Sequence, residues 1–431
     1  MNYSQTIDYL FTRLPMFSRI GADAFKKDLT NTLRLCEALG NPHTQFKCIH
    51  IAGTNGKGSS SHMLAAVLQS AGYTTGLYTS PHLKDFRERI KVNGRMCEEA
   101  FVTDFTERIR PLIEELSPSF FEITVAMAFD YFARQRVDVA VVEVGLGGRF
   151  DSTNIILPEI SLVTNIGWDH MALLGDTLDK IAFEKAGIIK PSVPVVISEV
   201  IPETRQVFTD KAASVNAPLI FAEEHHYVAD WRHEHHQLLV EMVDTDTDAH
   251  HQYALDLAGI YQLKNLAGVL ETIHQLKRKG WHIEHTHILQ GLAHVKKLTG
   301  LHGRWELIRQ KPDVVLDVGH NADGIRQINR QIELTDHHHL HIVIGMVKDK
   351  DITAVLSLLP RHASYYFTQA QIPRALDAAT LQQQAAVYQL IGNVYPDVNT
   401  ALRQALSHAH PDDLILVCGS VFLIGEVGNI E

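Results

Sequence analysis

Short apolar runs alternate with helical stretches through the first half of the chain. The stretch 59–72 has apolar residues at helical spacing and ends on a glycine. Apolar runs without polar alternation are typical of strands buried on both faces, as in a parallel sheet. Strands that alternate with helices predict a doubly wound α/β domain. The strand candidates in this half are 47–53, 74–80, 137–145, 159–167 and 193–199.

Residues 217–257 have a different pattern, in which apolar residues alternate with polar ones. The segments 217–224, 236–244 and 251–259 favour hairpin strands, so we expect an antiparallel addition to the first domain. The segment from Gly259 to Lys297 has helical spacing.

A second strand–helix alternation follows a glycine-containing junction at 298–306. It predicts a smaller Rossmann-like α/β domain of ordinary size. We therefore expect two domains, 1–297 and 298–431. The strand candidates of the second domain are 311–319, 339–347, 363–370 and 412–420.

Composition narrows the possible partners. The 39 Lys+Arg and 50 Asp+Glu residues give a net charge of −11, which disfavours binding to a nucleic-acid backbone. The four cysteines are far apart, as in a protein of a reducing compartment. No signal-type N-terminus or apolar run of roughly 18 residues is present. We expect a cytoplasmic monomer that binds neither membrane nor nucleic acid.

The sharpest local signal is GTNGKGS at 53–59, between a predicted strand and a predicted helix. Glycines allow backbone N–H groups to point at phosphate oxygens, and the helix N-terminus adds partial positive charge. Lys57 is able to reach the β- and γ-phosphates. Gly58 separates Lys57 from the hydroxyl of Ser59, which departs from the strict P-loop pattern. The alternative is a glycine-rich turn beside a surface lysine.

Two polar residues follow other predicted strands. Glu143 ends an apolar run and precedes a glycine-rich stretch, while His170 follows the run at 159–167. Ligands of open α/β sheets bind at the carboxyl ends of the strands, where an acid is able to hold Mg²⁺ opposite a P-loop. The simpler alternatives are a salt-bridge partner for Glu143 and a structural role for His170.

The second domain offers weaker candidates. Asp317 and His320 end one predicted strand, Ser420 follows another, and Arg304 lies at the domain junction, where it is able to clamp phosphate. Each also fits a cap, a turn or an ion pair. The histidine clusters have no regular helical spacing and no cysteine nearby, so we interpret them as surface polar residues: 225–226, 233–236, 250–251 and 337–339.

Taken together, these motifs resemble the folylpolyglutamate synthase/dihydrofolate synthase family of the Mur ligase superfamily. The resemblance covers nearly the whole chain, and the order of the motifs makes it specific. The motifs are GTNGKGS (53–59), TSPHL (79–83), ERIKVNG (88–94), FFEITVAMAF (120–129), EVGLGGRFDSTN (143–154), the stretch 169–190, HGRWE (302–306), DVGHN (317–321), KDKD (348–351) and CGSVFLIGEV (418–427).

The resemblance implies an ATP-dependent ligase with a pterin-binding N-terminal segment, a central ATP-binding domain and a C-terminal glutamate-ligase domain. ATP would convert a carboxylate into an acyl phosphate, and the amine of L-glutamate would displace the phosphate. The acceptors would be dihydropteroate and reduced folates. Two Mg²⁺ ions, Lys57 and Arg304 would neutralise the triphosphate and the developing charge.

The resemblance also assigns roles to individual residues. Catalytic roles fall on Lys57, Lys185 and His320, and Lys185 matches a lysine that is carbamylated in the superfamily. The loop FSRIGADAF (17–25) would join the pterin pocket. The ATP-binding residues would be Gly53, Thr54, Asn55, Gly56, Lys57, Gly58, Ser59, Asn265, Arg304 and Asp317; the metal ligands Ser80, Glu143 and His170; and the pterin contacts Phe121, Glu122 and Asp151.

Three alternatives remain open from the sequence. The enzyme could carry out folylpolyglutamate extension only, with no activity on dihydropteroate. A cell-wall Mur ligase is a weaker alternative, because TSPHL and FFE resemble the folate branch. A P-loop nucleotide-dependent regulatory protein would have no use for Lys185 or for the pterin-side residues.

Overall fold

The computed structural model describes residues 1–16 and 28–429, which form two compact units. Unit 1 comprises Met1–Asp256 and Tyr261–Leu301, and unit 2 comprises Leu257–Ile260 and His302–Glu431. Both have an α/β fold, as predicted. In the described part of the chain, no helix is long and apolar enough to cross a membrane.

Unit 1 is built on a mixed eight-stranded sheet with the strand order β4-β3-β2-β5-β1-β6-β7-β8. From β2 to β8 all neighbours are parallel, and the short β3–β4 hairpin pairs antiparallel at one edge. The strands are β1 (Lys47–Ala52), β2 (Thr75–Tyr78), β3 (Ile90–Val92), β4 (Arg95–Met96), β5 (Val139–Glu143), β6 (Ile160–Val163), β7 (Val195–Ile197) and β8 (Leu219–Phe221).

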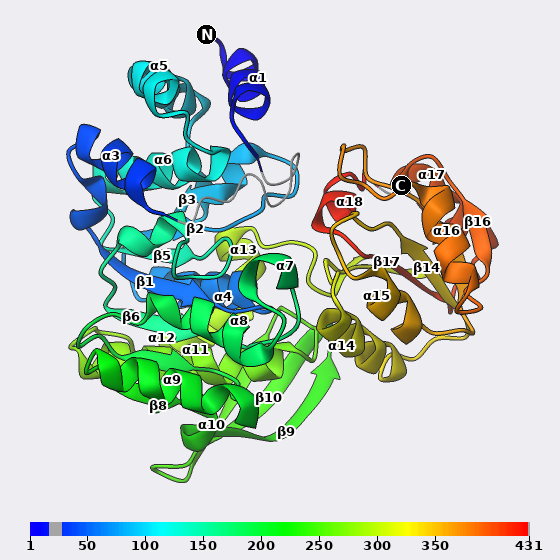
Figure 1. Cartoon of the computed structure of the whole chain (residues 1–431). Helices are drawn as coiled ribbons and strands as arrows, with labels where there is room; N and C mark the ends of the chain where they lie inside the picture. The colour runs from blue at the N-terminus through cyan, green and yellow to red at the C-terminus, as the bar shows by residue number, and fades with distance from the viewer. Residues whose placement is uncertain (17–27, 430–431) are drawn as a thin grey trace. The chain divides into compact units, whose positions relative to one another are not determined.

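Helices cover both faces of this sheet. Figure 1 shows α5 and α6 on the β2–β3 side and α9 beside β8. The helix after β1, α4, is buried from Ser59 to Leu68 because α11, α12 and α13 pack around it. The helices of unit 1 are α1 (Tyr3–Arg13), α3 (Thr30–Ala38), α4 (Lys57–Ser70), α5 (Glu99–Leu116), α6 (Phe120–Arg134), α7 (Met171–Leu174), α8 (Leu178–Lys185), α9 (Pro202–Ser214), α10 (Ala222–His225), α11 (Gln262–Arg278), α12 (His285–Ala293) and α13 (Val295–Thr299).

The antiparallel addition exists, but its strands differ from the prediction. It consists of β9 (His226–Glu234), β10 (Gln237–Asp244) and β11 (Ala249–Leu255) in the order β11-β10-β9. The predicted strand 217–224 is wrong as a member of this sheet, because β8 extends the large parallel sheet instead. We missed β9 because its residues are mostly polar and exposed, so its sequence lacks apolar alternation.

Unit 2 has a six-stranded sheet in the order β12-β13-β17-β14-β15-β16, parallel from β13 to β16 with β12 antiparallel at one edge. The four predicted strands are present, whereas the short edge strands β12 and β16 were not predicted. The elements are β12 (Glu306–Arg309), β13 (Asp313–Leu316), β14 (Leu340–Ile344), β15 (Ser364–Phe367), β16 (Gly392–Val394), β17 (Leu414–Cys418), α14 (Ala322–Glu333), α15 (Ile352–Leu358), α16 (Ala378–Ala386), α17 (Val398–His408) and α18 (Val421–Gly425).

Candidate active site

The candidate site of unit 1 lies at the carboxyl edge of its large sheet. Strand β1 leads directly into the glycine-rich loop, and β2, β5 and β6 run parallel to it. Ile51 pairs with Glu143, and Tyr78 pairs with Val142, so the three strands end at the same level. Polar residues that follow these strands are therefore brought together although they are far apart in sequence.

The segment after β6 braces the glycine-rich loop. The amide of Thr54 donates to the carbonyl of Asn165 at 2.9 Å, and the amide of Asn55 donates to Asn165 Oδ1 at 2.8 Å. Thr54 Oγ1 also exchanges hydrogen bonds with the backbone of Gly167, at 3.0 and 3.1 Å. The loop is thus preorganised by fixed contacts. Asn165 was not singled out from the sequence, although a polar pair directly after a strand was a usable signal.

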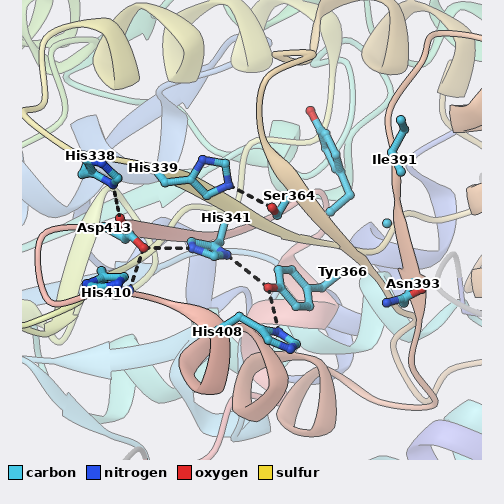
Figure 2. A pocket seen from close by; sticks show the side chains of 12 residues that line it. His338, His339, His341, Ser364, Tyr366, Ile391, Asn393, His408, His410 and Asp413 are labelled. Carbon is cyan, nitrogen blue, oxygen red and sulfur yellow. Dashed lines mark hydrogen bonds and ion pairs between the residues drawn. The ribbon is translucent and has the colours of Figure 1, made fainter.

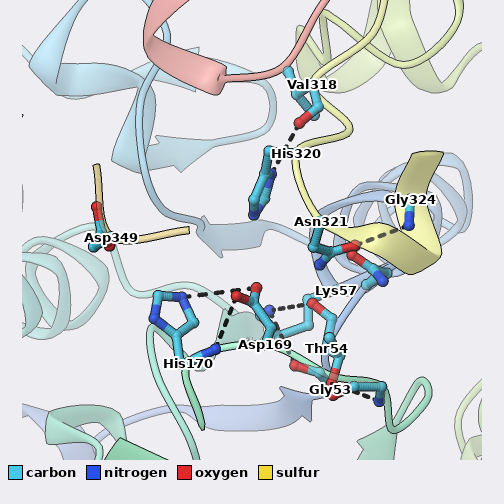
Figure 3. Close-up of polar contacts among 12 residues, drawn as sticks. Gly53, Thr54, Lys57, Asp169, His170, Val318, His320, Asn321, Gly324 and Asp349 are labelled. Carbon is cyan, nitrogen blue, oxygen red and sulfur yellow. Dashed lines mark hydrogen bonds and ion pairs between the residues drawn. The ribbon is translucent and has the colours of Figure 1, made fainter. Parts of the chain in front are cut away.

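Two lysines converge on the first carbonyl of this loop. Lys57 Nζ, shown in Figure 3, donates to the carbonyls of Gly53 and Thr54, both at 3.1 Å. Lys185 ends α8, is only 4% exposed, and its Nζ donates to the Gly53 carbonyl at 2.8 Å. Sequence reasoning alone would have treated Lys185 as a solvated helix lysine, whereas the fold buries it at the phosphate loop.

The loop ends where α4 begins, and α11 lies against that point. Gly56 has φ +84°, and a Cβ placed on it would lie 2.2 Å from Asn265 Oδ1, so only glycine fits there. Asn265 Nδ2 donates to Gln262 Oε1 at 2.8 Å, and Gln262 Nε2 donates to Ser59 Oγ at 3.1 Å. Asn265 therefore lies beside the glycine-rich loop, and Gln262, which was not predicted, orients it.

The predicted metal ligands follow β2, β5 and β6. Glu143 is 4% exposed, and its Oε2 accepts the backbone N–H of Ser80 at 3.2 Å. His170 has φ +51° at the start of α7, and its amide donates to Asp169 Oδ1 at 2.9 Å. Figure 3 also shows the His170 ring facing the Asp169 carboxylate, with Nε2 3.8 Å from Oδ2.

The predicted pterin contacts surround the glycine-rich segment after β5. The Phe121 ring lies against Gly145, since a Cβ on that glycine would be 2.4 Å from the ring. Glu122 is 3% exposed, and its Oε2 accepts the amide of Ser119 in a capping box at the start of α6. The predicted loop 17–25 lies outside the described residues.

Asp151 is engaged inside the protein rather than presented on the surface. It is 2% exposed; Oδ2 accepts the amide of Leu146 at 2.8 Å, and Oδ1 accepts the amide and hydroxyl of Thr153 at 3.0 and 2.5 Å. Burial raises the pKa of Asp151. Its carboxylate therefore holds the segment that carries Gly145 in place.

Asp151→Asn should destabilise the protein by about 3 kcal/mol, because the new NH₂ group would face N–H or O–H donors in a buried site. Urea titration gives the free energy of unfolding. Asp210→Asn, at an exposed position of α9, is the matched control and should change this free energy by less than about 0.5 kcal/mol. Equal effects of the two substitutions would contradict this role of Asp151.

In unit 2, Asp317 organises the segment that carries Arg304. Asp317 is 3% exposed, and its two oxygens accept the amides of Trp305 at 2.9 Å and Gly319 at 2.8 Å. This pairing explains why HGRWE and DVGHN occur together. Arg304 Nη1 lies 3.2 Å from the carbonyl of Gly303.

The rest of DVGHN forms the start of α14. His320 Nδ1 lies 3.0 Å from the Val318 carbonyl, and Asn321 Oδ1 accepts the amide of Gly324 at 2.8 Å. Both contacts are drawn in Figure 3. Ser420 likewise caps α18 after β17. The Gly419 amide donates to the carbonyl of Gly319, so the two predicted strand ends are adjacent.

A cavity of about 490 Å³ lies at the opposite, amino-terminal edge of the unit 2 sheet (Figure 2). His341 on β14 is 3% exposed; its Nε2 lies 3.2 Å from Asp413 Oδ2 and its Nδ1 lies 3.1 Å from the hydroxyl of Tyr366. Burial lowers the pKa of His341. Within residues 1–16 and 28–429, no three His, Cys, Asp or Glu side chains are placed to hold a metal ion.

One histidine of the predicted surface clusters is not at the surface. His226 is 8% exposed, and its Nε2 lies 3.0 Å from Glu271 Oε2 on α11. Gln275 donates to the other oxygen of Glu271 at 2.6 Å. The interpretation as a surface residue was wrong for His226, because it begins β9 where that strand packs on α11.

Comparisons with known proteins agree with this architecture. Residues 51–273 match the Mur ligase middle domain, and residues 303–421 match the Mur ligase glutamate ligase domain. The dihydrofolate synthase/folylpolyglutamate synthase of Bacillus subtilis is 32% identical, over 93% of this chain and 94% of that protein.

The chain belongs to the dihydrofolate synthase/folylpolyglutamate synthase family of Mur ligases.

This confirms the family and the enzyme class, an ATP-dependent glutamate ligase, that the motifs predicted. A solved structure of Escherichia coli FolC in complex with DHPP and ADP matches this folate-type ligase with a TM-score of 0.85 at 27% identity, over 99% of this chain and 96% of that one. The chain spans about half the length of a 33% identical relative from Haloferax volcanii, which is named "Probable bifunctional folylpolyglutamate synthase/dihydropteroate synthase".

A second solved member of the family has Mn, AMPPNP and L-glutamate bound. It has a TM-score of 0.83 and 27% identity, over 99% of this chain and 97% of that one. Nucleotide and metal binding are therefore properties of relatives with this fold. In the present ligase, the predicted nucleotide and metal residues of unit 1 lie around one sheet edge, and those of unit 2 lie around Asp317.

Proposed function

We propose that this chain joins L-glutamate to dihydropteroate and to the glutamyl tail of reduced folates, using ATP and an acyl phosphate. The observation that carries the proposal is the convergence of the glycine-rich loop, Lys185 and the Ser80–Glu143 pair at one sheet edge. An aromatic ring, Phe121, lies beside the same edge on Gly145. Nucleotide, metal and an aromatic substrate would then meet in one region.

The nucleotide would be held mainly by backbone and by cations. The amides at the start of α4 would bind phosphate oxygens, together with the partial positive charge of that helix end. Lys57 would leave the carbonyls of Gly53 and Thr54 and turn to the β- and γ-phosphates. Arg304, Asn265 and Asp317 would complete the nucleotide contacts.

Two Mg²⁺ sites are part of the proposal. Glu143 supplies a carboxylate oxygen, the neighbouring Ser80 a hydroxyl and His170 an imidazole nitrogen, and this mainly oxygen donor set fits a hard divalent cation. When bound, the ions would neutralise phosphate charge. The Ser80 amide holds Glu143 Oε2, which keeps the carboxylate at the end of β5.

In the reaction itself, the acceptor carboxylate would attack the γ-phosphorus and ADP would leave. The glutamate amine would then attack the acyl carbon, lose a proton and release phosphate as the amide forms. His320 would lie near the amine. Positioning of reactants whose charges repel one another is the main task of the protein in such transfers.

On the pterin side, the face of Phe121 would stack on the ring and Glu122 would accept its N–H groups. Asp151 would act by holding the segment around Gly145, because its oxygens already accept hydrogen bonds from Leu146 and Thr153. The family assignment also leads us to propose a cytoplasmic monomer. The buried free thiols of all four cysteines are compatible with a reducing compartment.

Carbamylation of Lys185 is the most specific part of the proposal. A carbamate would turn a buried cation beside Gly53 into an anion suited to a second metal ion. Lys185→Ala should lower turnover by about 10²-fold, and added acetate should partly restore it. Lys57→Ala is the control, since acetate is unable to replace a cation. Full activity of Lys185→Ala without acetate would contradict the role.

The test of the function is ADP release with Mg·ATP and L-glutamate, using dihydropteroate and tetrahydrofolate as acceptors. Release with both acceptors is expected. Release with tetrahydrofolate alone would mean that the enzyme is a folylpolyglutamate synthase that does not act on dihydropteroate. ATP hydrolysis that is indifferent to glutamate and to both acceptors would reject the proposal in favour of a nucleotide-dependent regulatory protein.

A further inference from the structure

The motif ERIKVNG has no part in the chemistry described above, yet it contains a buried lysine. Lys91 on β3 is 5% exposed, and its Nζ donates to the carbonyls of Thr299 at 2.8 Å and Gly300 at 3.2 Å. These carbonyls end α13, and Gly300 follows in the left-handed conformation with φ +66°. The ammonium therefore caps the partial negative end of this helix.

The helix that follows the glycine-rich loop, α4, also contacts Thr299. His62 on α4 is 4% exposed, and its Nδ1 lies 2.7 Å from Thr299 Oγ1. The Thr299 hydroxyl donates to the Val295 carbonyl at 2.6 Å, so it accepts its other bond from Nδ1–H of His62. Thr299 is thus held both by the strand that carries Lys91 and by the helix that begins at Lys57.

The turn of the β3–β4 hairpin makes a third contact with the end of α13. Asn93 and Gly94 both have positive φ, +49° and +74°. A Cβ on Gly94 would lie 2.0 Å from the carbonyl of Leu298, so the turn is pressed against α13 and only glycine fits. We refer to Lys91, His62, Thr299 and Gly300 as the exit clamp.

The exit clamp lies directly before the segment that links unit 1 to unit 2. Leu301 is the last residue of unit 1, and Arg304 lies three residues further on, in unit 2. His62 lies five residues after Lys57, or about 7.5 Å along α4. Arg304 follows Thr299 by five residues, which span at most about 18 Å. The segment that carries Arg304 therefore starts from a point fixed to the phosphate-loop helix.

We propose that Lys91 and His62 are positioning residues for the nucleotide: by locking Thr299 and Gly300 to β3 and α4, they tether Arg304 within reach of the triphosphate. The inference rests on the proposed function, because it uses the role of Arg304 as a phosphate contact. In this proposal the clamp residues act through Arg304 and not by contact with a substrate. Their effect passes through the segment that links the two units.

A double-mutant cycle in the full-length protein tests this coupling. Lys91→Met keeps the length of the side chain and removes the ammonium, and Arg304→Ala removes the residue to be positioned. Lys91→Met should raise the KM for ATP by roughly tenfold in the wild-type background and by less than about twofold beside Arg304→Ala, as expected for coupled residues. The kcat should change much less than KM. Additive effects would overturn the proposal.

Lys190 provides a matched control. It is also a lysine of unit 1, it is half-buried, and its Nζ donates to the carbonyl of Asn154 at 2.7 Å. Burial lowers the pKa of both lysines. Any effect of Lys190→Met on the KM for ATP should be additive with the effect of Arg304→Ala. If Lys190→Met instead couples to Arg304→Ala as strongly as Lys91→Met does, the coupling reflects a general loss of stability, and the proposal is overturned.

Two further measurements keep the outcome decisive. If Lys91→Met fails to fold, Thr299→Val removes the hydroxyl held by His62 and takes its place in the cycle. The same double-mutant cycle can also be measured through the affinity for ADP instead of through turnover. This measurement separates the present inference from the proposed function. Protein that binds ADP without ligating glutamate would reject the function, and coupling in ADP affinity would still decide the clamp.

Discussion

Lys57→Ala is expected to lower the rate of ADP release by at least about 10³-fold while the protein remains folded. Lys57 is the one cation inside the glycine-rich loop itself, where phosphate negative charge would concentrate. Lys57 is half-buried, and its ammonium donates to the carbonyls of Gly53 and Thr54, contacts that it is able to exchange for phosphate oxygens. Initial rates with saturating glutamate and tetrahydrofolate measure the effect.

A lysine on the same strand–helix unit serves as the control. Lys47 begins β1, its side chain is 61% exposed, and Lys47→Ala should leave the rate unchanged. Circular dichroism and thermal denaturation should show both variants folded, because neither side chain fills the core. An unaltered rate in Lys57→Ala would contradict the assignment of residues 53–59 as the phosphate loop.

The second large effect is loss of stability in acid through His50. This histidine is fully buried on the central strand β1, and its Nε2 lies 2.8 Å from Thr153 Oγ1. The Thr153 hydroxyl donates to Asp151, so Nε2–H of His50 donates to it and Nδ1 carries no proton. In the described part of the chain, Nδ1 has no hydrogen-bond partner. Burial lowers the pKa of His50 to about 3.

The sign of the effect follows from the two pKa values. Above pH 6.5 His50 is neutral in both the folded and the unfolded state, so its titration does not change the free energy of unfolding. As the pH falls from 6.5 towards 3, the unfolded chain binds a proton that the folded protein refuses. The folded state should lose about 2 kcal/mol by pH 5 and about 4 kcal/mol by pH 3 from this residue.

Urea titrations between pH 7.5 and pH 5 isolate this contribution. His50→Gln, which has no titratable ring, should lose about 2 kcal/mol less stability over that range than the wild type. His235, whose side chain is 89% exposed, provides the control: the stability of His235→Gln should depend on pH as that of the wild type does. A His50→Gln curve parallel to that of the wild type would show that His50 does not control acid stability.

The central fold could be predicted from sequence because its signals are local. The runs that become β1, β5 and β6 are mainly apolar, as is typical of strands covered on both faces. The hairpin of β3 and β4 was not among the predicted strands, and neither were β9, β12 and β16, which lie at sheet edges or in solvent. The residues of β9, β12 and β16 gain little from burial, so their composition carries no clear periodicity.

Some site residues could likewise be recognised from local sequence, whereas others depend on tertiary packing. The glycine-rich loop could be recognised from its spacing, because phosphate binding by backbone requires glycines in fixed order. Lys185 could be singled out only through the family resemblance, since its burial against Gly53 arises from the packing of α8 at the sheet edge. The pterin contact of Asp151 stays a prediction from the family resemblance, and only the structure shows that its carboxylate holds neighbouring amides.

By itself, then, the sequence determined that this protein has two α/β units, a glycine-rich loop between a strand and a helix, and the ordered motifs of a folate-type Mur ligase. These features depend on short-range spacing, which the chain carries locally. Only the tertiary structure decided that Lys91 and His62 both hold Thr299, and that β8 joins the parallel sheet. Such contacts join residues far apart in sequence, and their free energy exists only once the helices and strands have packed.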